Sequence, residues 1–232
     1  MNLPNKITLT RICLIPVFLF FYLADFIPYG KLIATIMFAL ISLTDLIDGK
    51  IARKRNLVTT LGAFMDPLAD KLLVMSGLIC IIAYPVTANG GSFAPMPILN
   101  PVYIGVVAVC IILAREFMIT ALRTLAASNG IVLKADMYGK VKTTFQFITI
   151  IYYLAYSFIV EEFYYAISGV ANTVLGIVGY ILLAITIILT IISGCNYMIK
   201  NKDVFKEKKK AEKENTKTDS EEIVVEVEEK KK

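Results

Sequence analysis

Six long apolar segments make up most of this 232-residue chain and constrain its fold more than any other feature. Each is close to the ~20 residues that an α-helix needs to cross the hydrocarbon core of a bilayer. Inside a bilayer, helices satisfy every backbone donor and acceptor within one segment. The sequence therefore predicts an all-α, polytopic membrane protein. Its six expected transmembrane helices are Thr8–Phe26, Lys31–Arg53, Leu61–Tyr84, Pro101–Ala126, Tyr138–Val160 and Asn172–Met198.

The composition agrees with a membrane protein and limits the chemistry that the chain can perform. Hydrophobic residues make up 57% of the chain, and the mean hydropathy is +0.68, far above that of a soluble domain. The chain has no histidine, which excludes histidine as a base, nucleophile or metal ligand. Any metal site must then be built from oxygen ligands, which favour hard cations such as Mg²⁺ or Mn²⁺.

Lysine and arginine are concentrated at one set of helix ends. At the opposite ends Lys31 is the only basic residue, and it is accompanied by Asp25, Glu161 and Glu162. The positive-inside rule therefore places the basic ends and both termini in the cytoplasm. We expect a multi-pass protein of the cell membrane whose active site faces the cytoplasm. The basic ends carry Lys6, Arg11, Arg53, Lys54, Arg55, Arg123, Lys134, Lys140, Lys142 and the Lys-rich C-terminal tail.

The two ends of the chain differ from the apolar segments. Leu3–Arg11 is mixed in polarity, which predicts a short amphipathic helix in the membrane interface. Residues 200–232 are rich in both lysine and acidic residues, which predicts a disordered, solubilising cytoplasmic tail. We therefore predict one membrane domain over residues 1–199 and a separate tail over residues 200–232.

Four aspartates interrupt the second and third apolar segments, where a charged side chain costs about 2–4 kcal/mol. Asp45 and Asp48 are three residues apart, and Asp66 and Asp70 are four apart, so each pair lies on one stripe of a helix. A short turn between the two segments would make them antiparallel neighbours with their stripes facing. Four carboxylates match two divalent cations, an arrangement suited to phosphoryl transfer.

The residues around the aspartates support a phosphate ligand. Gly49, Ala52 and Gly62 have little or no side chain, so a ligand can approach the helices closely. Arg53 adds a fixed positive charge suited to phosphate. The alternative, that the aspartates are solvated residues at helix ends, explains those at the start of the third helix. It fails for the second helix, because its C-terminal dipole disfavours anions.

The spacing of these residues resembles the signature of the CDP-alcohol phosphatidyltransferase family. All eight fixed positions of the pattern D-x-x-D-G-x-x-A-R-x8-G-x-x-x-D-x-x-x-D are matched, and the six-helix layout agrees up to about Lys200. The resemblance implies transfer of a phosphatidyl group from CDP-diacylglycerol to an alcohol, with release of CMP. It also implies a homodimer.

The resemblance assigns roles to individual residues. It implies that two Mg²⁺ or Mn²⁺ ions are held by Asp45, Asp48, Asp66 and Asp70. Asp70 would also be the general base that acts on the acceptor hydroxyl. The site for CDP-diacylglycerol would be lined by Asn5, Thr8, Asp48, Gly49, Ala52, Arg53 and Gly62.

Basic residues of the fourth and fifth segments predict a pocket for an anionic acceptor. Arg115 is followed by a further apolar stretch, so snorkelling to the membrane surface explains it poorly. Arg123 is eight residues further on and shares its helix face. Arginine forks suit a phosphate dianion. We expect the acceptor phosphate to be bound by Arg115, Arg123, Lys140 and Lys142.

The expected reaction uses sn-glycerol 3-phosphate as the acceptor and gives phosphatidylglycerol phosphate and CMP by direct displacement. Shorter stretches at Asn5–Arg11, Asp66–Lys71, Ala114–Phe117 and Gly139–Thr143 resemble the members of the family that use this acceptor. One alternative keeps the chemistry with serine, inositol phosphate or phosphatidylglycerol as the acceptor. Another is a cation transporter with an acidic site, although transport does not explain the spacing of the small residues.

Overall fold

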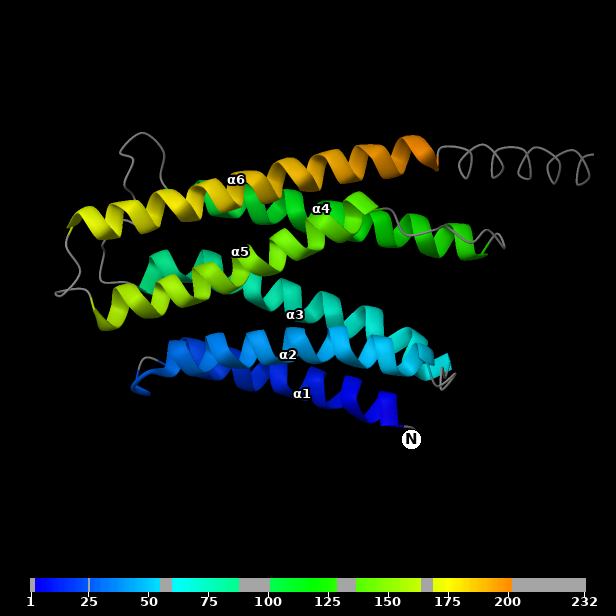
Figure 1. The fold of residues 1–232 in the computed structure, drawn as a ribbon, viewed down its shortest axis with the longest axis horizontal. Coiled ribbons are helices and arrows are strands. Elements are labelled where there is room, and N and C mark those ends of the chain that lie inside the picture. Colours follow the sequence, from blue (N-terminus) through cyan, green and yellow to red (C-terminus); the bar gives the residue numbers. More distant parts are fainter. Residues whose placement is uncertain are drawn as a thin grey trace, which may run out of the picture.

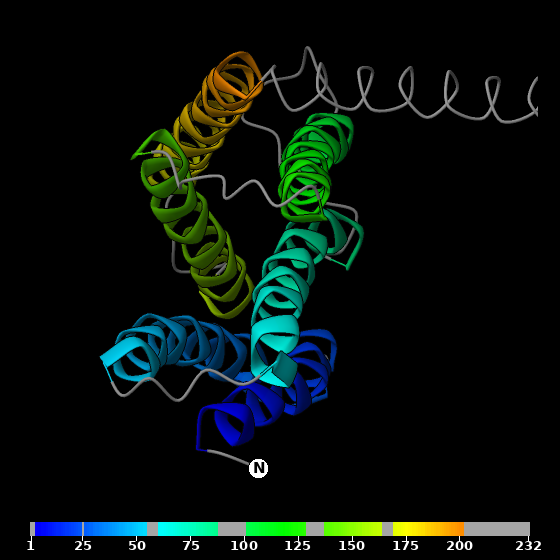
Figure 2. The ribbon, with the colours of Figure 1, turned by 90° about the vertical axis from the view of Figure 1, so that its right-hand side faces the viewer.

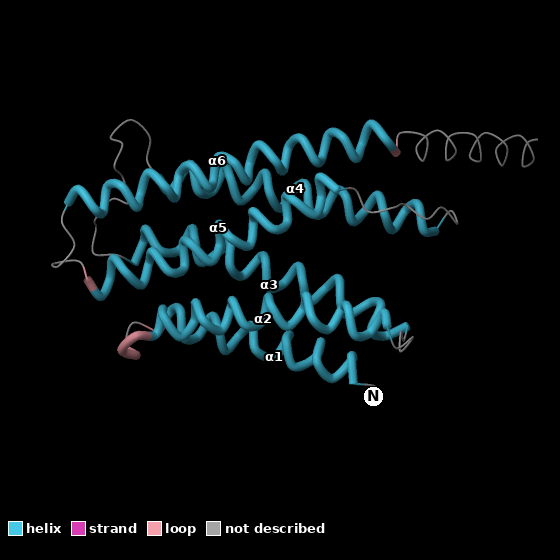
Figure 3. The backbone as a smooth tube through the Cα atoms, in the orientation of Figure 1, coloured by secondary structure: helices cyan, strands magenta, loops and turns pink. Residues whose placement is uncertain are grey.

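A computed structural model describes the backbone of residues 3–24, 26–54, 60–87, 101–128, 137–163 and 169–201. Side chains are described for residues 8–24, 26–44, 65, 67–82, 104–127, 137–163 and 170–201. Within these ranges all regular secondary structure is helical (Figure 3), so the prediction of an all-α fold is confirmed. The predicted tail lies outside the described residues, apart from its first two positions.

The six predicted segments are all helical, and each helix runs antiparallel to the one before it (Figure 1). Most boundaries agree with the prediction to within three residues. The predicted interfacial helix is helical but is not a separate element, because the first helix runs unbroken from Leu3. The helices are α1 Leu3–Leu23, α2 Gly30–Lys54, α3 Thr60–Thr87, α4 Pro101–Ser128, α5 Met137–Glu162 and α6 Gly169–Lys200.

A tight turn ends α1 earlier than the sequence predicted. Pro28 cannot donate a backbone hydrogen bond, and Tyr29 adopts a left-handed conformation with φ 58°. Gly30 then begins α2, and a Cβ atom there would lie 2.7 Å from the carbonyl oxygen of Phe21. The absence of a side chain at Gly30 therefore lets the start of α2 pack directly on the backbone of α1.

The end view of the bundle shows α3 and α5 between the α1–α2 pair and the α4–α6 pair (Figure 2). The main apolar core lies where α1, α2, α3 and α5 meet, around the fully buried rings of Phe18 and Phe38, whose centroids are 5.5 Å apart. Leu73 of α3 and Ile150 of α5 are equally buried in this core. These contacts fix α3, which lines the candidate site, and α5, which supports the site through Lys142.

Alternation of direction brings the chain's N-terminal end, the ends of α2, α4 and α6, and the starts of α3 and α5 to one end of the bundle (Figure 1). This is the arrangement that the distribution of basic residues predicts; that this end faces the cytoplasm stays a prediction. Among the described residues, three helical segments are long and apolar enough to cross a membrane, and two further apolar helices are shorter. The three are Ile104–Ala127, Met137–Phe163 and Val170–Lys200.

Gly77 of α3 offers a test of this packing. A Cβ atom there would lie 2.6 Å from Ile150 Cγ2 and 2.8 Å from Phe38 Cε2, closer than side-chain atoms can pack. We expect Gly77→Ala to lower the free energy of unfolding by about 1–3 kcal/mol, the usual cost of overpacking a core. Thermal unfolding in detergent micelles measures it. The matched control is Gly105→Ala on α4, where no atom lies within 4 Å of the new Cβ; an equal loss in both variants would contradict the packing.

Candidate active site

The aspartate motif is divided between two helices that meet the same end of the bundle. Asp45–Arg53 lies in the last turns of α2, and Gly62–Asp70 lies at the start of α3 (Figure 1). Of the predicted metal ligands, only Asp70 has a described side chain, and the described side chains contain no group of three or more potential metal ligands. The predicted four-aspartate cluster therefore stays a prediction. The other predicted residues whose side chains lie outside the described ranges are Asn5, Gly49, Ala52, Arg53 and Gly62.

Asp70 lines a pocket between α3 and α4. The side chain is half-buried, and the adjacent residue Lys71 lines the same pocket. Opposite them on α4 lie Glu116 and Phe117. The space at this pocket amounts to ≈ 280 Å³ when the open solvent at its mouth is counted with it. The remaining lining residues are apolar, namely Val74, Met75 and Leu113. The carboxylates of Asp70 and Glu116 and the ammonium group of Lys71 therefore line one small space whose other walls are apolar.

A charged network centred on Glu116 supports this pocket from behind. The Lys142 side chain has 0% exposure, and its Nζ donates to Glu116 Oε1 and to Gln146 Oε1. Arg115 Nη1 donates to the same Glu116 oxygen at 3.0 Å. A single carboxylate therefore holds a cation from α5 and a cation from α4.

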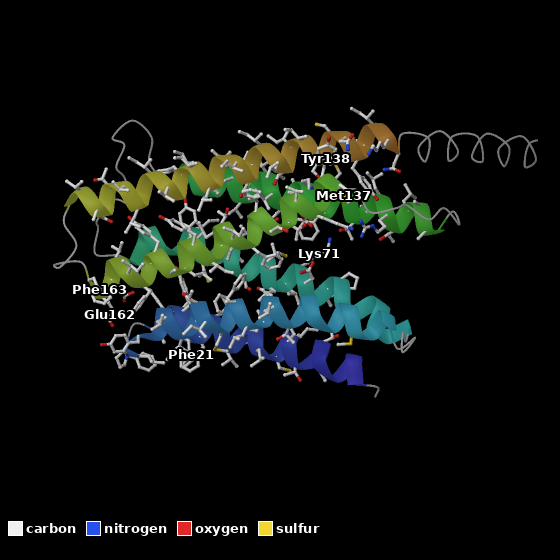
Figure 4. The ribbon with its side chains drawn as sticks, in the orientation of Figure 1. Phe21, Lys71, Met137, Tyr138, Glu162 and Phe163 are labelled. Atoms are coloured by element: carbon white, nitrogen blue, oxygen red, sulfur yellow. The ribbon has the colours of Figure 1, made fainter. Side chains whose placement is uncertain are left out.

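The same network reaches α3 and α6. Lys71 Nζ donates to the backbone carbonyl of Glu116 at 3.3 Å and to Thr120 Oγ1. Arg115 Nη2 donates to Ser193 Oγ of α6 at 2.6 Å. Figure 4 places Lys71 in the half of the bundle where α5 begins at Met137 and Tyr138. Four helices are thus connected through polar atoms beside the pocket.

The structure divides the predicted acceptor-binding residues into two groups. Arg115 and Lys142 are brought together in the interior through Glu116, whereas Arg123 and Lys140 are exposed. Lys71 lies within reach of the charges of Glu116 and Asp70 and, more weakly, of Arg123 and Arg115. The region therefore combines interior and surface cations on α3, α4 and α5. Whether any of them binds an acceptor stays a prediction.

Small residues allow Arg115 to lie between α4 and α6. A Cβ atom on Gly194 would lie 3.2 Å from Arg115 Cγ, and one on Gly139 would lie 3.7 Å from Arg115 Nη2. Gly139 directly precedes Lys140, so the start of α5 borders the guanidinium group.

Of the residues predicted to line the CDP-diacylglycerol site, Thr8 has a described side chain. It lies on α1, on the other side of the bundle, and is buried, with 4% exposure.

The sequence alone did not predict a role for Lys71, Glu116 or Gln146, although all three take part in the network. The available signal was the presence of ionisable residues inside apolar segments, which are rare unless they have a partner or a function. Pairing across helices could not be read from spacing along one helix.

An all-helical bundle with long apolar helices and a charged interior defines a membrane protein with an internal polar site. Comparison with known proteins then identifies its family. A sequence model described as CDP-alcohol phosphatidyltransferase matches residues 1–192. The chain belongs to the CDP-alcohol phosphatidyltransferase family. The resemblance that the aspartate motif suggested is therefore confirmed.

Similar proteins with curated names share one description, CDP-diacylglycerol–glycerol-3-phosphate 3-phosphatidyltransferase. The Bacillus subtilis protein is 37% identical over 216 residues, which cover 88% of this chain and 97% of the relative. The Rickettsia bellii protein is 34% identical over 197 residues, covering 84% and 93%. The Wigglesworthia glossinidia protein is 32% identical over 211 residues, covering 89% and 98%. The similarity thus extends over almost the whole of each relative.

The buried pair predicts a stability effect of Glu116→Gln. This substitution keeps the shape of the side chain but leaves the fully buried Lys142 ammonium without a carboxylate. We expect the free energy of unfolding to fall by about 3–5 kcal/mol, the usual cost of breaking a buried ion pair from one side. Thermal unfolding in detergent measures the change. Glu162→Gln at the exposed end of α5 is the control and should stay within about 0.5 kcal/mol of the wild type; similar melting of both variants would disprove the pair's importance.

Proposed function

We propose that this protein transfers a phosphatidyl group from CDP-diacylglycerol to sn-glycerol 3-phosphate, giving phosphatidylglycerol phosphate and CMP. It would then be a phosphatidylglycerophosphate synthase. The observation that carries the proposal is the pocket in which Asp70 and Lys71 lie side by side. A carboxylate can accept the proton of a hydroxyl group, and a nearby ammonium can bind a phosphate. The names of the relatives, which align over most of this chain, support the same acceptor.

We propose that two divalent cations, Mg²⁺ or Mn²⁺, complete the site. Members of this family generally use divalent metal ions. The donor set fits, because a chain without histidine offers four carboxylates at the motif spacing, and hard cations prefer oxygen ligands. The ions would be held by Asp45, Asp48, Asp66 and Asp70. When bound, they would neutralise charge on the phosphate oxygens and on the departing CMP.

The chain's own residues would position the two substrates and move one proton. Asp70 would take the proton from the primary hydroxyl of the acceptor, whose oxygen attacks the phosphorus that bears diacylglycerol. Arg53 would bind phosphate, since a guanidinium group matches its geometry. The remainder of the CDP-diacylglycerol site would be formed by Asn5, Thr8, Asp48, Gly49, Ala52 and Gly62. No nucleophilic side chain is needed, so the transfer is direct.

The basic region explains why the acceptor should carry a phosphate. Arg115, Arg123, Lys140 and Lys142 would together provide the positive potential for it. Glu116 neutralises only part of this charge, because it faces both Arg115 and Lys142. A neutral or zwitterionic acceptor such as serine would leave the remaining cations without a role.

The distribution of basic residues also supports a proposal for how the protein lies in the membrane. We propose that residues 1–199 form the membrane domain with its active site at the cytoplasmic face of the cell membrane, and that residues 200–232 are a soluble tail. The basic helix ends at one end of the bundle support this orientation. A homodimer is proposed from family membership.

A comparison of acceptors tests the proposed reaction. Purified protein with CDP-diacylglycerol and Mg²⁺ should release CMP rapidly with sn-glycerol 3-phosphate and at least about tenfold more slowly with serine, inositol phosphate or phosphatidylglycerol, because only the first is both small and phosphorylated. Radiolabel transfer into lipid measures the products. Omission of the metal is the control. If product forms only with a different acceptor, sn-glycerol 3-phosphate is not the substrate. If the folded protein is neither active nor stabilised by CMP, the result favours the transporter alternative.

Asp70→Asn tests the general base. The amide cannot accept the hydroxyl proton, so we expect kcat to fall by about 10²-fold to 10⁴-fold. CMP should still raise the melting temperature, because most of the nucleotide site is unchanged. Asp219→Asn in the charged tail is the matched control and should keep full activity. Full activity of Asp70→Asn would remove this residue from the mechanism.

A further inference from the structure

We propose that Lys71 is the residue that contacts the acceptor phosphate directly, and that Lys142, although equally cationic, supports the site through Glu116 without touching the substrate. This inference rests on the proposed function and specifies which cation determines the choice of acceptor. The two lysines differ in their surroundings, because Lys71 lines the pocket whereas Lys142 is fully buried against Glu116.

Lys71 is placed to bind one end of a small acceptor while Asp70 binds the other. Consecutive residues of a helix point about 100° apart, yet both side chains line the same pocket. A three-carbon acceptor carries its phosphate and its reacting hydroxyl at opposite ends. One molecule in the pocket can therefore reach the carboxylate with its hydroxyl and the ammonium with its phosphate.

The hydrogen bonds of Lys71 orient its ammonium group without pairing it directly with a carboxylate, although the charges of Glu116 and Asp70 act on it. Among the described residues, Lys71 donates to a backbone carbonyl, that of Glu116, and to a hydroxyl, that of Thr120. Both are neutral oxygens, and a lysine ammonium has three N–H donors. Nζ also lies 5.7 Å from the centroid of the Phe117 ring, whose face attracts a cation. The result is a half-buried ammonium group held at the wall of the pocket.

Lys142 and Arg115 have the opposite character. The Lys142 side chain has 0% exposure and donates to a carboxylate, so a ligand would have to break a buried ion pair to reach it. Arg115 has 11% side-chain exposure, and its two terminal nitrogens already donate to Glu116 and Ser193. These two cations raise the local potential and hold α4, while Lys71 is the one that lines the pocket.

Lys71→Gln tests direct contact with the acceptor phosphate, because a lost contact should change KM for the acceptor but not KM for CDP-diacylglycerol. We expect KM for sn-glycerol 3-phosphate to rise about tenfold or more, because a hydrogen bond to a charged group is lost. KM for CDP-diacylglycerol should change less than twofold. The Ki of inorganic phosphate, measured as a competitor of the acceptor, should rise by a similar factor. Lys71→Arg, which keeps the charge, should lie closer to the wild type than Lys71→Gln in both constants.

A pair of threonines on α4 provides a test that leaves every charge in place. Thr120→Val removes the hydroxyl that accepts from Lys71, whereas Thr124→Val removes a hydroxyl one turn further along α4. Each hydroxyl also donates to the carbonyl four residues earlier, so the local helix contacts are matched. We expect KM for the acceptor to rise about threefold or more in Thr120→Val and to stay unchanged in Thr124→Val.

The outcomes separate this inference from the proposed function. If the wild type does not use sn-glycerol 3-phosphate, the proposed function fails. If the wild type is active but Lys71→Gln leaves KM for the acceptor and Ki for phosphate unchanged, Lys71 does not contact the phosphate. Should Lys71→Gln fail to fold, the threonine pair decides, and equal KM values for its two members overturn the proposal. Lys142→Gln should mainly lower the melting temperature; a selective rise in its acceptor KM with unchanged melting would instead assign the contact to Lys142.

Discussion

The ion pair between Glu116 and Lys142 is the interaction on which the described half of the site depends. A fully buried ammonium is strongly unfavourable unless a carboxylate is held against it. Glu116 also accepts from Arg115, and its backbone carbonyl accepts from Lys71. One residue of α4 therefore fixes the position of cations from three helices. Because the carboxylate cannot move without leaving the buried Lys142 ammonium without a counter-ion, the α4 wall of the pocket is held in one geometry.

The remaining helix contacts explain why this interior can be polar. Between helices in lipid, apolar surface gives little specificity of register, so small residues and hydrogen bonds set the alignment. α5 and α6 are joined by the buried hydroxyls of Thr149 and Thr186 at 2.8 Å and by Tyr152 Oη, which donates to the carbonyl of Leu175 at 2.6 Å. At the other end of the bundle, buried Lys31 of α2 pairs with Glu161 of α5. α5 is thus fixed at both ends, and Lys142 reaches Glu116 from a helix with little freedom to shift.

The sequence predicted the helices well because length and apolarity suffice in a bilayer. Six apolar segments of about 20 residues became six helices, and the basic helix ends were correctly grouped at one end. The family was also predicted correctly, since the eight motif positions have fixed spacing. The predicted metal and nucleotide residues fall mainly on side chains outside the described ranges, so their roles stay predictions.

The interior network could not be predicted in the same way, for a physical reason. When nearly every position of a helix is apolar, the hydrophobic pattern does not reveal which face turns inward. Lys142 and Lys140 are two residues apart and equally basic, yet the first has no exposed surface and the second is exposed. Only the position of α5 in the bundle distinguishes them, because it places the Glu116 carboxylate of α4 beside Lys142.

The proposed selectivity for an anionic acceptor would follow from the same asymmetry. A cation that is already paired contributes potential but offers no open donor to a ligand, whereas the described hydrogen bonds of Lys71 go to neutral oxygens and its side chain lines the pocket. The proposed base, Asp70, is its neighbour in sequence, so any acceptor that reaches the base must also meet the ammonium. In the proposed mechanism, a phosphate would be stabilised by the Lys71 ammonium and a cationic group would be repelled by it. The order Asp70-Lys71 on one turn of α3 would then link proton transfer and acceptor choice in a single pocket.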